Sequence, residues 1–111
     1  GDYFSEEPYM EWIARKRDLV KSRYMEMLQR KADLHEELDQ TDKAIEAWSL
    51  VLTADPYLEA GYQNLMILYA DSGRKKKALA LYEECETLFK KSLGAALDDQ
   101  TVELYRKIRS D

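Results

Sequence analysis

The side chains able to do covalent or acid–base chemistry are few in this chain and far apart. There is one histidine, His35, and one cysteine, Cys85. One His and one Cys fall short of the four ligands of a structural zinc site, and neither has an obvious catalytic partner. Gly61, Gly73 and Gly94 stand alone, so they form no phosphate-binding loop. We therefore expect no enzyme, no cofactor and no metal.

The acidic side chains are plentiful, but they are scattered over what we expect to be helix surfaces. Paired carboxylates act as general acid and base only in a cleft that shifts their pKa values. The sequence pattern indicates no such cleft around the two densest acidic groups, which are Glu83, Glu84 and Glu86, and Asp98 and Asp99.

Composition and charge predict one folded all-α domain. The 111 residues are 45% hydrophobic and include only two prolines and four glycines, and alternating β-branched runs are absent. Seventeen basic against twenty-two acidic residues give a net charge of −5, which argues against a nucleic-acid-binding face. A lone cysteine excludes an internal disulfide and suits a reducing cytoplasm. No apolar run reaches the ~18 residues expected of a membrane helix.

An internal repeat organises the middle of the chain. A shift of 34 residues places Ala78 on Ala44 and Tyr82 on Trp48, so a small residue is followed four positions later by an aromatic one. This period is typical of tetratricopeptide helical hairpins, although Lys31 and Met66 depart from that pattern. In the same register His35 faces the core, and Cys85 falls on Val51 as a small buried hydrophobe.

The apolar spacing predicts a tetratricopeptide-like right-handed array of about five antiparallel helices. We expect residues 1–8 to be an extended leading segment from a preceding domain, with Tyr3 and Phe4 packing back on the body, and residues 9–111 to be one domain. Eight apolar residues give the first helix a face that drifts along it, as in a long helix that touches more than one neighbour: Trp12, Ile13, Leu19, Val20, Tyr24, Met27, Leu28 and Leu34. The expected helices are 9–38, 42–53, 56–72, 75–91 and 100–109, with Asp55 as the N-cap of the third and Pro56 at its first position.

Four stretches of the chain, taken in order, carry a resemblance to a known family: Gly1-Asp2-Tyr3-Phe4 with Trp12 and Arg17; Asp55-Pro56-Tyr57 with Glu59 and Leu65-Met66; Gly73-Arg74 with Ala78-Leu79 and Tyr82; and Leu93-Gly94 with Thr101, Leu104-Tyr105 and Ile108. Together they resemble the bacterial transcriptional activator domain, which is found behind the DNA-binding domain in regulators of the Streptomyces antibiotic regulatory protein type. One departure is that Ala95-Ala96-Leu97-Asp98 replaces the proline and serine usual after Leu-Gly, so the resemblance does not predict the loop there.

The resemblance implies a role in transcription regulation, without base contacts by this domain. It implies packing on an adjacent DNA-binding domain of the same chain, dimerisation, or contact with RNA polymerase. DNA would be reached only through the domain that precedes Gly1, and no membrane is involved. The expected interaction surfaces are Arg15, Lys16 and Arg17 near the interdomain junction, and Arg106 and Arg109 on the last helix, although charge runs are commonly solvated faces.

An alternative hypothesis is a general adaptor that binds a peptide segment in its concave groove. One fold hosts many functions, so the fold alone does not decide between the two. In the repeat register the groove is lined by polar residues of the first helix and by three residues of the third. These are Glu26, Gln29, Arg30 and Asp33, and then Gln63, Asn64 and Ile67.

Overall fold

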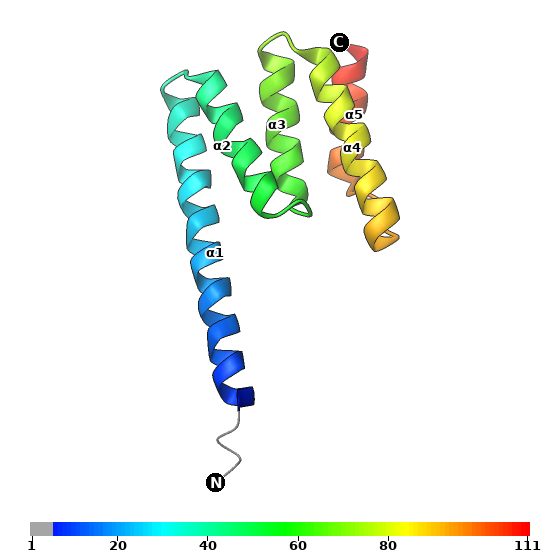
Figure 1. The fold of residues 1–111 in the computed structure, drawn as a ribbon. Coiled ribbons are helices and arrows are strands. Elements are labelled where there is room, and N and C mark those ends of the chain that lie inside the picture. Colours follow the sequence, from blue (N-terminus) through cyan, green and yellow to red (C-terminus); the bar gives the residue numbers. More distant parts are fainter. Residues whose placement is uncertain (1–5) are drawn as a thin grey trace.

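The computed structural model describes residues 6–111, which form five helices and no strand (Figure 1). Each helix packs against the next one along the chain, and α5 also touches α3. This arrangement confirms the expected all-α class and agrees with a tetratricopeptide-like array. The bounds are α1 Glu6–Glu37, α2 Thr41–Ala54, α3 Glu59–Asp71, α4 Lys75–Leu93 and α5 Asp99–Ser110.

The first helix begins earlier than the sequence pattern predicts. α1 starts at Glu6, so residues 6–8 are helical and not extended. Pro8 is tolerated there because the first-turn N–H groups of a helix have no intrahelical acceptor. The remainder of the expected leading segment, including Tyr3 and Phe4, lies outside the described residues.

The third helix begins later than the sequence pattern predicts. Asp55 does not cap α3: its carboxylate accepts a hydrogen bond from the Tyr57 backbone N–H at 3.1 Å, and the Leu58 N–H bonds to the Asp55 carbonyl at 3.2 Å. Pro56 therefore sits in a turn, which its fixed φ also suits. As a result, α3 begins at Glu59 and not at Pro56.

Two equivalent turns confirm the repeat. Gly73, between α3 and α4, has a φ of +79°, and Asp39, which lies 34 residues earlier between α1 and α2, has a φ of +58°. Both positions need the left-handed conformation, which glycine adopts without strain and Asp tolerates better than most residues. Gly94 ends α4 in the same conformation.

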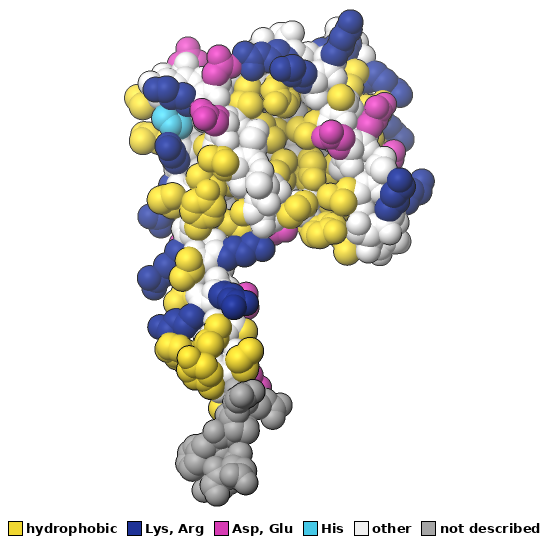
Figure 2. Space-filling view, viewed as in Figure 1, with side chains coloured by type: hydrophobic (Ala, Val, Ile, Leu, Met, Phe, Trp, Pro, Cys, Tyr) yellow, Lys and Arg dark blue, Asp and Glu magenta, His cyan; other side chains and the backbone are white. Residues whose placement is uncertain are grey.

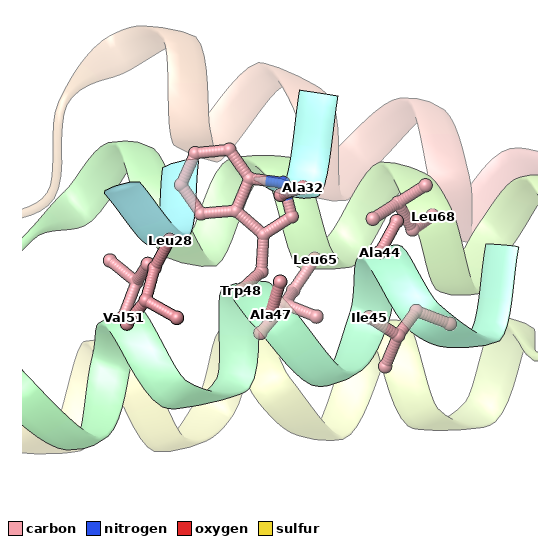
Figure 3. Close-up of a cluster of buried hydrophobic side chains, with 9 residues drawn as sticks. All are labelled: Leu28, Ala32, Ala44, Ile45, Ala47, Trp48, Val51, Leu65 and Leu68. Carbon is pink, nitrogen blue, oxygen red and sulfur yellow. The ribbon is translucent and has the colours of Figure 1, made fainter. Parts of the chain in front are cut away.

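The first hydrophobic cluster joins α1, α2 and α3 (Figure 3). Ala44 is fully buried, which lets the helices approach closely, and Trp48 is only 5% exposed, with its indole reaching toward Ala32 of α1. The indole N–H also donates to the Glu36 carboxylate at 3.4 Å. The cluster comprises Leu28, Ala32, Ala44, Ile45, Ala47, Trp48, Val51, Leu65 and Leu68.

The second cluster repeats this design one hairpin later. Ala78 is fully buried, and Tyr82 stacks on Tyr105 of α5 with ring centroids 4.0 Å apart. Met66 and Cys85 are completely buried in its interior. The equivalence of Ala44 with Ala78 and of Trp48 with Tyr82 is therefore confirmed. The cluster comprises Tyr62, Met66, Ala78, Tyr82, Cys85, Phe89, Leu97 and Ile108.

A small polar network fixes α5 on α3. Thr101 is fully buried; its hydroxyl donates to the Glu59 carboxylate and accepts a hydrogen bond from the Gln63 amide at 2.7 Å. The same carboxylate accepts from the Asp98 backbone N–H at 2.8 Å. Asp98 is the N-cap of α5, because its side chain accepts from the Gln100 N–H. The loop of Ala95 to Asp98, which departs from the pattern described above, therefore leads into a helix whose N-terminus is held by hydrogen bonds.

Candidate protein-interaction surfaces

The N-terminal half of α1 projects beyond the rest of the protein (Figure 1). α1 has 32 residues whereas α2, against which it packs, has only 14. At 1.5 Å per residue the first helix is longer than its neighbour by roughly 27 Å. Its contribution to the first cluster starts only at Met25 and Leu28. Among the described residues, no other helix therefore covers most of α1 before Met25.

Large apolar side chains are exposed on this projecting half. Val20 is 66% exposed, Tyr9 61%, Met10 58% and Trp12 50%. Figure 2 shows hydrophobic and basic side chains alternating along it. The prediction that the apolar residues of α1 contact several neighbours is wrong, because α2 ends too early to reach those before Met25 and because Met27 lies on a face of α1 that α2 does not cover. Among the eight apolar residues expected to face neighbours, Leu28 alone is buried and Ile13 is half-buried.

One hollow on this half of α1 has an apolar floor and a basic rim. Trp12 and Val20 supply apolar surface, and the Lys16 ammonium lies 5.6 Å from the centre of the Trp12 ring. Exposed clusters of aromatic side chains with cations are a common feature of protein–protein interfaces. The lining residues are Trp12, Ile13, Lys16, Arg17, Val20, Lys21 and Tyr24.

The predicted basic stripe is divided by the helix geometry. Lys16 and Arg17 line the hollow, whereas Arg15 does not. Arg15 instead lies 4.0 Å from the Glu11 carboxylate one turn earlier, with both side chains about two-thirds exposed. An exposed pair of this kind contributes little to stability.

The second predicted surface lies at the other end of the array, on α5. Arg106 pairs with Glu103 at 3.8 Å, and the Arg109 guanidinium lies 5.3 Å from the Tyr105 ring centre. Both arginines are exposed. α1 and α5 lie on opposite sides of the molecule (Figure 1), so the two basic surfaces do not form a single site.

Several residues of the alternative groove already have partners. The Gln63 amide donates to buried Thr101, and the Asn64 amide donates to the Ala60 carbonyl of its own helix at 2.9 Å. Ile67 is 40% exposed on α3 and remains open to solvent. On α1, Gln29 is half-buried and the other three residues are exposed: Glu26, Arg30 and Asp33.

The single histidine has a local structural contact. His35 is half-buried, and its Nδ1 lies 2.7 Å from the Gln40 side-chain oxygen, next to the turn between α1 and α2. It shares a shallow hollow with Lys31, Lys43 and Glu46.

The single cysteine is chemically quiet. Cys85 is fully buried, and burial raises the pKa of its thiol to about 12, with the Glu59 and Glu86 carboxylates adding to the rise. Since the thiolate is the reactive form, Cys85 stays unreactive near neutral pH. Burial likewise raises the pKa of Tyr62 and of Tyr82.

No cluster of three or more His, Cys, Asp or Glu side chains within residues 6–111 could hold a metal ion. None of the five helices has an apolar stretch that could cross a membrane.

The fold and its surfaces define an all-α array of helical hairpins with one projecting helix. Residues 1–109 match the family described as the bacterial transcriptional activator domain. The chain belongs to this family of non-catalytic domains of bacterial transcriptional activators, and it serves in transcription regulation. No match was found among curated proteins or among solved structures.

The surface that the sequence pattern assigned incorrectly is the exposed apolar face of α1. A usable signal was present: Ile13, Val20, Met27 and Leu34 recur every seven residues. A seven-residue apolar repeat is typical of a helix that pairs with another helix. The internal repeat provided no such helix for residues 9–24.

Proposed function

We propose that this chain is the docking domain of a cytoplasmic bacterial transcriptional regulator, and that the projecting half of α1 packs against the DNA-binding domain of the same polypeptide. The observation that supports this is the exposure of Val20, Trp12 and Tyr24 on the part of α1 that extends past α2. In this arrangement the domain reads no bases, and it couples DNA binding to activation through protein contacts.

The energetics favour a covered α1 in the working protein. Burying one large apolar side chain contributes about 1.5–3 kcal/mol. Several such side chains are left exposed along one helix, whereas singly scattered ones would need no explanation. A folded domain placed against the hollow would gain this burial, and Lys16 and Arg17 at its rim would set the orientation.

Cysteine labelling tests this proposal directly. Val20→Cys should react rapidly with a maleimide in the isolated chain and about 10-fold or more slowly in the intact regulator, because the core of an interface excludes solvent. Native Cys85 is buried and protonated at pH 7, so it gives little background. A DNA-binding domain supplied as a separate chain should slow the reaction as well.

Ile67→Cys is the matched control, because Ile67 is an exposed apolar residue on α3. Its labelling rate should be the same in the isolated chain and in the intact regulator. Equal rates at Val20→Cys in the two forms would overturn the proposal. Protection of Ile67→Cys alone would favour the alternative, a peptide-binding adaptor that uses the groove.

A further inference from the structure

The exposed apolar residues of α1 follow a seven-residue repeat. Seven residues make nearly two helical turns, so residues at this spacing fall on one face. Val20, Met27 and Leu34 are each more than half exposed, and Ile13 precedes them at the same spacing. The face therefore supplies the apolar residues of a seam, by which we mean the strip of α1 along which a second helix would pair. It is separate from the buried face, which carries Leu28.

A second series with the same spacing is basic. Lys16, Arg23 and Arg30 each lie three residues after a member of the apolar series, and all three are exposed. In a two-stranded helix pair, positions three residues apart line the same seam. The ion pairs among the described side chains, residues 8–111, leave these three cations without a carboxylate. The seam therefore alternates apolar residues with unpaired cations.

The wider charge pattern points the same way. Residues 12–32 contain seven Lys and Arg but only two acidic residues, Asp18 and Glu26, in a chain whose net charge is −5. Long cationic side chains can lay their aliphatic stems on apolar surface while the charged ends stay at the edge of an interface. The Lys16 ammonium itself already lies over the Trp12 ring.

We propose that this seam pairs with an acidic amphipathic helix of the partner, which presents apolar residues to the apolar series and Glu or Asp to the basic series. This inference rests on the proposed docking function and specifies the chemistry of its partner. Opposite charges along a helix pair set partner choice and orientation. The matching helix would carry its acidic residues at seven-residue spacing.

A second copy of the chain does not fit the seam. Parallel pairing of two α1 helices would place Lys16 opposite Lys16, Arg23 opposite Arg23 and Arg30 opposite Arg30, and like charges in close contact repel. Antiparallel pairing would place these cations against the apolar series. In both directions the cations would remain unpaired, so an acidic partner is favoured over self-association.

Two synthetic peptides test the proposal against the full 111-residue chain. The Glu peptide is a four-heptad helix with leucine at the positions facing the apolar series and glutamate at those facing the cations; the Lys peptide carries lysine in place of glutamate. Calorimetric titration should show binding of the Glu peptide that weakens as salt is raised, because salt screens charge pairs at an interface rim. The Lys peptide should bind at least about 10-fold more weakly, because it opposes cations to cations.

The triple variant Lys16→Glu/Arg23→Glu/Arg30→Glu provides the reciprocal test. It should no longer bind the Glu peptide and should bind the Lys peptide instead. Its melting temperature by circular dichroism should be unchanged, since all three side chains are exposed. Failure to bind the Glu peptide, or equal binding of both peptides, would overturn the inference. A chain that dimerises in the ultracentrifuge, and still dimerises after the triple substitution, would overturn it in favour of a second copy.

The outcome separates this inference from the docking proposal. Protection of Val20→Cys in the intact regulator without Glu-peptide binding means that α1 docks on a partner of other chemistry. Glu-peptide binding without protection in the intact regulator means that the seam takes an acidic helix from outside that polypeptide, and the interdomain proposal fails.

Discussion

Trp48→Ala is expected to lower the free energy of unfolding by about 3–5 kcal/mol, the range for removing a large buried aromatic side chain. Trp48 is 5% exposed and belongs to the cluster that joins α1, α2 and α3. Truncation leaves a cavity beside Leu28 and Ala32 and removes the hydrogen bond to Glu36. Urea unfolding gives the change in free energy, and thermal unfolding should show a midpoint lowered by about 10 °C or more.

Leu50→Ala is the matched control, because Leu50 lies on the same helix but is 44% exposed. Its cost should stay well below that of Trp48→Ala, as for most exposed positions. Equal effects of the two substitutions, or a midpoint unchanged by Trp48→Ala, would mean that the face of α2 assigned to the core is wrong.

The second large effect is expected in the function of the intact regulator. Val20→Glu combined with Met27→Glu introduces two charges into the apolar series of the seam. Loss of one central interface residue costs about 2 kcal/mol or more, so the pair should weaken docking by about 100-fold or more. Reporter transcription should fall accordingly. Both side chains are more than half exposed, so the stability of the domain itself should change little.

Ile67→Glu makes the same chemical change on α3, at a residue of the alternative groove. Reporter transcription should be unaffected by it. Loss of transcription from Ile67→Glu, together with wild-type transcription from the α1 double variant, would contradict the docking account and support the groove. Equal melting temperatures for the three proteins are needed, so that transcription reports contacts and not folding.

The repeat was predictable because residues 34 positions apart have the same structural role in both hairpins. Ala44 and Ala78 are both fully buried, and Trp48 and Tyr82 both fill the space one turn later. Asp39 and Gly73 both adopt the left-handed conformation. Burial and backbone conformation restrict which residue types fit at such positions. The residue types in a single sequence therefore reveal them.

The fate of the apolar residues of α1 was not predictable in the same way. Periodicity shows that Val20 and Met27 belong on an apolar face, but it does not say whether that face is covered within the chain. The answer depends on the length of α2, which ends too early to reach Val20, and on the orientation of α1, which turns Leu28 and not Met27 toward α2. The network of Glu59, Gln63 and Thr101 was missed for a related reason, because it joins residues about 40 positions apart.

The most direct test of the account is small-angle X-ray scattering on the isolated chain, because the docking proposal requires the N-terminal half of α1 to project freely. We predict a mass of 13.0 kDa and a radius of gyration close to the 17.7 Å of the single chain. A compact domain of this length would have a radius of gyration of about 13 Å. A value near that figure would mean that α1 folds back and covers its own seam, and a dimeric mass that becomes monomeric in the Val20→Glu/Met27→Glu variant would mean that a second copy covers it. Either result would contradict the account.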